Sequence, residues 1–150
     1  MQLVCPAGNL PALQAAVDAG ANAVYAGFRD QTNARAFPGL NFSDEELRAG
    51  VRYAHAKGAK VYLALNTYPD SARLNDWYTA VDKAAALGCD AIIAAEMAVL
   101  DYATRTHPGL PRHLSVQGSA TTAPALKYAF ERFGISRAVL PRVLSLQKVE

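Results

Sequence analysis

Short apolar runs alternate with longer amphipathic segments along this chain. Several amphipathic segments end at a glycine (Gly20, Gly58, Gly88 and Gly134), and an apolar run begins a few residues later. Glycine readily takes the left-handed conformation that closes a helix, and short strands that alternate with helices are typical of a parallel sheet. The pattern predicts six strands, over residues 3–5, 23–26, 61–65, 91–95, 114–117 and 138–140.

Capping residues mark where the helices between these strands begin. Asn9 is followed by Pro11 in the first helical turn, and Ser43 and Glu46 have the spacing of a capping box. We expect helices to start near Asn9, Ser43, Ser71 or Asn75, Met97, Thr122 and Ser145. Apolar residues recur at helical spacing, so each helix has a face to pack on the sheet. In the second and third helices these faces carry Leu47, Val51 and Ala54, and Trp77, Val81 and Ala84.

The number of strands decides between two α/β architectures. A closed (β/α)8 barrel needs about 250 residues, whereas this chain of 150 residues stops soon after its sixth predicted helix begins. An open doubly wound sheet should instead end with a covered edge. We therefore predict a parallel TIM-like (β/α) barrel that is truncated to six strands. Residues 1–150 would form the N-terminal part of a single (β/α)8-type domain, with the remainder of the barrel absent.

Polar side chains follow the carboxyl end of each predicted strand. These ends face the same way in a parallel sheet, so their side chains should converge on one site. Guanidinium groups suit planar carboxylates, which indicates a small molecule that carries a carboxylate. We expect Glu96, Arg35 and Arg142 to be catalytic, Asn9, Asn33, Asn66, Gln117 and Ser119 to bind substrate, and Arg29 to lie among them. Glu96 is either a general base or the ion-pair partner of an arginine.

The connection from Phe28 to Asn41 is fourteen residues long and interrupts the regular alternation. Loops of more than about 12 residues in a compact domain are usually either functional or disordered. This loop follows the carboxyl end of a strand, where ligands bind in parallel α/β proteins. We therefore expect a lid or a binding loop in preference to a disordered segment.

The cysteines and histidines give little support for nucleophilic or metal chemistry. Cys5 and Cys89 should lie at opposite ends of the sheet, so they should neither form a disulfide nor share a metal ion. Both are expected to be structural thiols, with a role in the site left open for Cys5. His113 should precede its strand at the far rim, so no histidine is expected to reach the site. The sequence thus indicates neither a Cys–His nor a Ser–His pair.

Composition narrows the class of protein further. The chain has 15 Lys and Arg against 13 Asp and Glu, a net charge of +2 without runs of one sign. This balance indicates no cluster of positive charge that would bind nucleic acid or an acidic membrane. No apolar run approaches the roughly 18 residues of a membrane span, and the N-terminus lacks the pattern of a signal peptide. We expect a cytoplasmic protein that has no transmembrane segment and binds no nucleic acid.

Four stretches resemble the N-terminal half of the collagenase-like peptidases of family U32. They are residues 3–9 (Leu-Val-Cys-Pro-Ala-Gly-Asn), 20–25 (Gly-Ala-Asn-Ala-Val-Tyr), 113–117 (His-Leu-Ser-Val-Gln) and 140–145 (Leu-Pro-Arg-Val-Leu-Ser). Within that family, residues 32–35 (Thr-Asn-Ala-Arg), 39–42 (Gly-Leu-Asn-Phe) and 140–143 are most similar to the members that act in ubiquinone biosynthesis. The likeness covers essentially the whole chain.

The resemblance implies a TIM-like barrel of which this chain is the first part. It also implies oxygen-independent hydroxylation of a small-molecule quinone precursor, in a heterodimer with the sister protein UbiV. A 4Fe–4S cluster is implied too, held by four cysteines of the second half, so that residues 1–150 would bind no metal or cofactor themselves. By resemblance to the family members that act on RNA, the hydroxyl oxygen would come from prephenate, a dicarboxylate, which suits the arginines.

Three other interpretations stay open. A collagenase-like peptidase would need a nucleophile and a base from outside these residues. An RNA-modifying hydroxylase of the same family should have a basic groove, and the near-neutral charge argues against one. A scaffold without activity of its own would only support its partner.

Overall fold

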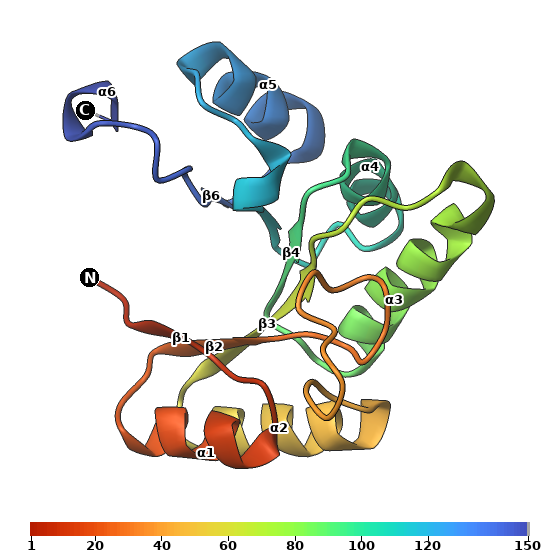
Figure 1. The fold of residues 1–150 in the computed structure, drawn as a ribbon, viewed down its shortest axis with the longest axis vertical. Helices are drawn as coiled ribbons and strands as arrows, with labels where there is room; N and C mark the ends of the chain where they lie inside the picture. The colour runs from red at the N-terminus through yellow and green to blue at the C-terminus, as the bar shows by residue number, and fades with distance from the viewer. Residues whose placement is uncertain (150) are drawn as a thin grey trace.

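The computed structural model describes residues 1–149, in which six strands alternate with six α-helices. All strand pairs are parallel, and neighbouring strands follow the order of the chain, β1-β2-β3-β4-β5-β6. The strands are β1 Val4–Pro6, β2 Ala23–Ala26, β3 Lys60–Leu65, β4 Ala91–Ala94, β5 Arg112–Leu114 and β6 Arg137–Ala138. The sheet curls into a half-barrel, as Figure 1 shows, which confirms the predicted fold class.

The first five helices cover the convex side of the curled sheet, whereas the short sixth helix stands apart beyond the last strand (Figure 1). They are α1 Leu10–Asp18, α2 Asp44–Ala56, α3 Leu74–Ala86, α4 Met97–Thr106, α5 Ala123–Phe133 and α6 Leu146–Val149. Two 3-10 turns, η1 Ser71–Arg73 and η2 Val116–Gly118, precede α3 and α5. No helix in the described range is long and apolar enough to cross a membrane.

The predicted helix starts agree with the observed caps. The Asn9 side chain accepts a hydrogen bond from the backbone N–H of Ala12, and Ser43 and Glu46 form both hydrogen bonds of a capping box. Thr122 caps α5 in the same way as Asn9 caps α1. Of the two starts expected for the third helix, Ser71 begins the 3-10 turn η1, and α3 itself begins at Leu74, next to Asn75.

The main core lies between the sheet and the helices. Alternate strand residues point outward to the helices, and Val24, Leu63 and Ile92 are fully buried there. The predicted helix faces are confirmed, because Leu47, Val51, Ala54, Trp77, Val81 and Ala84 are all buried in this layer. A second, smaller cluster occupies the concave face of the sheet and is formed by Ala23, Tyr62 and Ala91.

The fifth strand lies earlier in the chain than predicted. Residues 114–117 were expected to be extended, but the strand is Arg112–Leu114 and residues 116–118 form the turn η2. The Ser115 hydroxyl accepts a hydrogen bond from the backbone N–H of Gln117 and so favours a turn at this point. The sixth strand is likewise shifted, to Arg137–Ala138 instead of residues 138–140.

Candidate functional site

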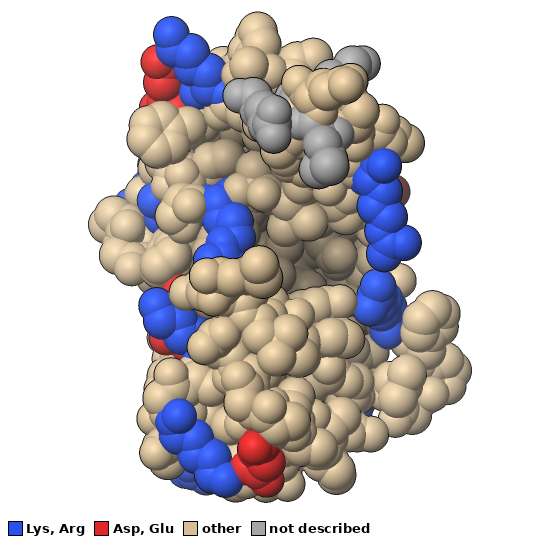
Figure 2. All heavy atoms as spheres, turned by 90° about the vertical axis from the view of Figure 1, so that its left-hand side faces the viewer, with Lys and Arg blue, Asp and Glu red and all other residues tan. Residues whose placement is uncertain are grey.

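A hollow of about 880 Å³ lies on the concave side of the half-barrel. All six strands and the connection between β2 and α2 contribute to its wall. Figure 2 views the molecule from its open side, where the surface is hollowed and Lys and Arg side chains stand on both flanks. A space of this volume suits a small molecule.

Two arginines that line the hollow lack a carboxylate partner in the described part of the chain. Arg35 donates a hydrogen bond to the Tyr25 hydroxyl at 3.3 Å, and Arg137 donates one to the side-chain oxygen of Gln2 at 2.6 Å. The Arg137 guanidinium also lies 5.6 Å from the centre of the Tyr62 ring. No Asp or Glu of the described residues lines the hollow. Its positive charge is therefore uncompensated, which favours an anionic ligand.

The loop from Phe28 to Asn41 is folded against the strand ends and forms part of the wall. Asn33 and Asn41 are both buried, and the Asn33 side-chain N–H donates to the Asn41 side-chain oxygen at 2.9 Å. The Asn41 side chain in turn donates to the backbone oxygen of Arg35 at 2.6 Å. This pair of amides holds the Arg35 segment at the hollow, as a binding loop requires.

Four of the predicted site residues line this hollow together, namely Asn33, Arg35, Asn66 and Gln117. The Asn66 side-chain oxygen accepts a hydrogen bond from the backbone N–H of Ala34 at 3.0 Å, which ties the loop to the end of β3. The backbone oxygen of Gln117 accepts from the Tyr68 hydroxyl at 2.6 Å. The converging strand ends therefore bring four of the eight predicted site residues to the hollow.

The other four predicted site residues are not among the residues that line the hollow. Asn9 caps α1, Ser119 is exposed with φ 52°, and Arg142 is exposed beyond β6. Glu96 caps α4, where its side chain accepts from the backbone N–H of Ala98 at 3.2 Å. No ion pair between Glu96 and a described arginine is present, so neither alternative for this carboxylate is supported by a contact. Their functional roles stay predictions.

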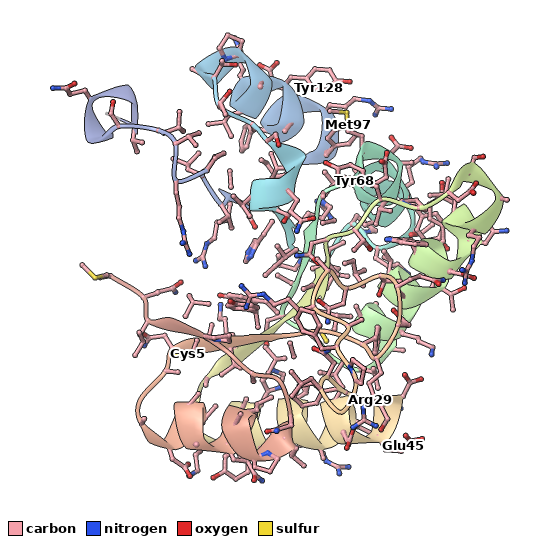
Figure 3. All side chains as sticks on the ribbon, in the orientation of Figure 1. Cys5, Arg29, Glu45, Tyr68, Met97 and Tyr128 are labelled. Atoms are coloured by element: carbon pink, nitrogen blue, oxygen red, sulfur yellow. The ribbon has the colours of Figure 1, made fainter. Side chains whose placement is uncertain are left out.

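Arg29 lies beside α2 and outside the hollow, as the label in Figure 3 shows. Its guanidinium pairs with the carboxylate of Glu46 at 2.5 Å and donates to the backbone oxygen of Asn41 at 3.0 Å. Arg29 therefore anchors the base of the loop to the helix. The expectation that it lies with the other arginines is wrong, because its guanidinium is held by Glu46 of α2 and points away from the hollow.

Several side chains of the hollow were not predicted as site residues, and Tyr25, Tyr62, His113 and Arg137 are among them. The expectation that no histidine reaches the site is wrong, because β5 begins at Arg112 and His113 points to the concave face. His113 is only 6% exposed, and its ring packs edge-on against Tyr62 with 4.7 Å between ring centres. Burial, followed by the charges of Arg137 and Lys60, lowers the pKa of His113 to about 4.

Strand alternation in the sequence could have placed His113 at the site, but the charged neighbour Arg112 argues against a strand at this position. Strand alternation from residue 112 would place His113 and Ser115 on one face and Arg112 and Leu114 on the other. A charged residue on the core-facing side argues against a strand, yet Arg112 is only 8% exposed. Its guanidinium is satisfied by backbone oxygens, including those of Leu110 at 2.7 Å and Phe133 at 2.8 Å.

The two cysteines do not form a ligand set. Cys5 packs against the core on the helix side of the sheet. Cys89 is buried two residues before β4, and burial and the charge of Asp90 raise the pKa of its thiol to about 12. Within residues 1–149, no group of three or more His, Cys, Asp or Glu side chains is placed to hold a metal ion. The residues of this chain thus do not fit an iron–sulfur cluster by themselves.

A parallel (β/α) half-barrel with a cationic hollow at the concave side of its strands defines a TIM-barrel-like protein with a candidate small-molecule site. The chain belongs to peptidase family U32, whose family model matches residues 8–150. It is 33% identical over 154 residues to the tRNA hydroxylation protein P of Escherichia coli, covering 99% of this chain and 32% of that protein. The Helicobacter pylori protein of the same name (strain 26695) is 36% identical, covering 97% and 34%.

A collagenase of Porphyromonas gingivalis is also similar, with 33% identity over 99% of this chain and 34% of that protein. The chain spans about a third of the length of these curated relatives. Among solved structures, the U32 peptidase Mk0906 superimposes with a TM-score of 0.74 at 15% identity, covering 93% of this chain and 58% of the other. At that identity the likeness supports the fold alone.

Proposed function

We propose that this chain is the N-terminal part of a (β/α)8 barrel in an oxygen-independent hydroxylase of ubiquinone biosynthesis, the U32 member UbiU. The relatives named as tRNA hydroxylation proteins support a hydroxylation role for the family. Residues 32–35 and 39–42, which carry the resemblance to the ubiquinone branch, form the loop that walls the hollow. In this proposal the protein acts on a quinone precursor, in a heterodimer with UbiV.

The observation that carries the proposal is the cationic hollow. Arg35 and Arg137 face it without carboxylate partners, while Tyr25, Tyr62 and Ile93 supply apolar and aromatic wall. This combination suits a small ring compound with an anionic oxygen better than a polymer. Prephenate, a dicarboxylate, would fit as the oxygen donor, because each arginine can receive one carboxylate.

The 4Fe–4S cluster of the proposed enzyme would need cysteines from outside these residues. Cys5 faces the helix layer and Cys89 is buried and protonated, so neither is arranged as a thiolate ligand. When bound, such a cluster would supply the electron transfer of the hydroxylation. The residues described here would contribute the binding and orientation of the small molecule.

Quinone profiling of a strain without the full-length gene, grown without oxygen, tests the proposal. The deletion should abolish ubiquinone, and the wild-type gene should restore it. Arg35→Ala should fail to restore it while thermal stability stays nearly intact, because Arg35 is exposed and makes one side-chain hydrogen bond. Arg48→Ala, an exposed arginine on α2, is the matched control and should restore it fully.

Two outcomes would count against the assignment. Normal anaerobic ubiquinone in the deletion strain removes the biosynthetic role, and unfolding of the Arg35→Ala protein makes that arginine structural. Arg142→Ala, tested beside them, decides whether this exposed arginine is catalytic as the sequence suggests. Iron content of the purified full-length protein tests the cluster independently of the quinones.

Hydroxylation of tRNA is the second candidate, because the curated relatives with that name cover almost all of this chain. A net charge of +2 without runs offers little for binding a polyanion. Mass spectrometry of nucleosides from the same deletion strain separates the two candidates. Loss of a hydroxylated nucleoside with unchanged ubiquinone would favour tRNA.

A collagenase-like peptidase has less support from the residues. Among residues 1–149, no histidine ring is hydrogen-bonded to a serine or a cysteine: the ring of His55 bonds to Asp90 and the ring of His107 bonds to Asp82. Both pairs lie on the surface. Peptide hydrolysis would therefore need its nucleophile and base from elsewhere.

A further inference from the structure

His113 lines the hollow beside Tyr62 and is paired in register with Arg137 of the next strand. Among the described residues, the histidine rings that form hydrogen bonds are those of His55 and His107. The ring nitrogens of His113 are not among the enclosed side-chain atoms that lack a partner, which is consistent with their facing the open space of the hollow. A ligand in the hollow can therefore contact this imidazole and Arg137 together.

The charged groups around His113 determine its protonation state. Tyr62 and Lys60 approach from β3 and Arg137 approaches from β6, while β4 contributes only the apolar Ile93 at the neighbouring position. Tyr25 and Arg35 lie elsewhere in the same hollow, and no described carboxylate lines it. Because burial and two cations all disfavour the charged form, the imidazole is neutral in the free protein.

We propose that His113 is a ligand-binding residue of the hollow, whose imidazole hydrogen-bonds an anionic oxygen of the ligand beside Arg137 and takes up one proton from the solvent on binding. The inference rests on the proposed function in one respect, because it takes the hollow as the site of a small anionic ligand. An anion placed between Arg137 and His113 offsets the cations that disfavour protonation. By linkage, protonation of His113 must then strengthen binding of the anion.

Calorimetric titration of the full-length protein in its complex tests this inference. Benzoate serves as the anionic probe and benzamide as a neutral probe of nearly the same shape. Titrations in two amine buffers with different ionisation enthalpies count the protons taken up near the pKa of histidine, at about pH 6. We expect uptake with benzoate, none with benzamide, and an affinity for benzoate that rises as the pH falls.

Substitutions assign the proton to a residue. His113→Gln keeps an amide that can hydrogen-bond but cannot titrate, so it should abolish proton uptake and weaken benzoate binding about tenfold. Arg137→Gln should weaken benzoate binding by at least about tenfold through loss of the charge. His55→Gln, at an exposed histidine on α2, is the matched control and should change neither quantity.

A second measurement avoids any effect of substitution on folding. In wild-type protein with labelled histidine, the His113 resonance should not titrate near neutral pH without ligand and should titrate there with benzoate bound. Absence of benzoate binding, binding without proton uptake, or unchanged uptake in His113→Gln would each overturn the inference. Normal anaerobic ubiquinone in the deletion strain would instead refute the biosynthetic assignment and leave the result for His113 intact.

Discussion

The imidazole of His113 is enclosed by Tyr62, Arg137 and the beginning of β3, and these neighbours hold it neutral. In the unfolded chain the pKa of His113 returns to its ordinary value of 6.5, whereas in the folded protein it is about 4. As the pH falls, the unfolded state therefore binds the proton first. The contribution of this residue to stability is complete above pH 6.5 and is lost as the pH falls toward 4.

We predict that His113→Gln reduces the acid sensitivity of the protein. Wild-type protein should lose on the order of 1 to 3 kcal/mol of unfolding free energy through this residue over that window. The variant should lose less between the same two pH values. Urea denaturation at a series of pH values measures the difference. If the unfolding free energies of the two proteins depended on pH in the same way, His113 would not be buried as described.

The two cysteines should differ in their reactivity toward an alkylating reagent. Burial raises the pKa of the Cys89 thiol to about 12, whereas Cys5 lies in the edge strand β1 and is partly exposed. Since the thiolate is the reactive form, we predict that Cys5 is alkylated in the native protein at about pH 8 while Cys89 is protected. Mass spectrometry after brief treatment with iodoacetamide measures this, and equal labelling would contradict it. Unfolding in urea should expose both.

The loop between β2 and α2 depends on a close approach at Gly27. A Cβ atom at this position would lie 2.2 Å from the side-chain nitrogen of Asn33. Asn33 cannot move away easily, because it is buried and bonded to Asn41 and to the backbone oxygen of Phe28. The glycine therefore leaves room for the amide pair that holds Arg35 at the hollow.

We predict that Gly27→Ala destabilises the protein by about 1 to 3 kcal/mol, a typical cost of overpacking. Gly109→Ala is the matched control, because a Cβ there meets nothing within 4 Å, and its stability should stay close to wild type. Thermal denaturation of both variants measures the effect. Equal melting temperatures would mean that the loop yields without cost and that Asn33 does not fix it.

Local sequence determined several elements correctly, and the exceptions have physical causes. Asn9, Ser43 and Thr122 start helices as predicted, because a cap needs only hydrogen bonds within one turn. The fifth strand was misplaced because Arg112 is buried by means of backbone oxygens from a distant helix end. No local pattern reveals such a partner, which lies 21 residues away.

The half-barrel brings its first and last strands together at one point of its open side. β1 and β6 are the two edges of the sheet, and Arg137 donates a hydrogen bond to Gln2, which lies just before β1. β6 has only two residues, whereas β3 at the centre has six and is almost entirely buried. Within residues 1–149, stability should therefore be lower at β6 than at β3.

We predict that hydrogen exchange is much faster at the amides of Ser136 and Val139, which attach β6 to β5, than within β3. Gln2→Ala should accelerate exchange at these two amides alone, because it removes the contact between the edges. Gln14→Ala, on α1, is a control of the same residue type and should leave β6 unchanged. Uniform exchange across the sheet would contradict this picture.

The hollow was predictable in part. Asn33, Arg35, Asn66 and Gln117 were expected at the carboxyl ends of strands and do line it together. Glu96 and Asn9 were expected there for the same reason, but both side chains cap helices instead. A residue at a strand end is close to the site by topology, whereas the direction of its side chain depends on which backbone donors lie nearest.

The amino-acid sequence alone determined the alternation of strands and helices, most helix starts and the family resemblance, because periodicity and capping act over a few residues. Only the tertiary structure decided which polar groups share the hollow. The curl of the sheet places Arg137 near Gln2, 135 positions away, and sets His113 against Tyr62. Charge and burial at such a site arise from side chains brought together by folding, and these contacts leave no periodic trace in the chain.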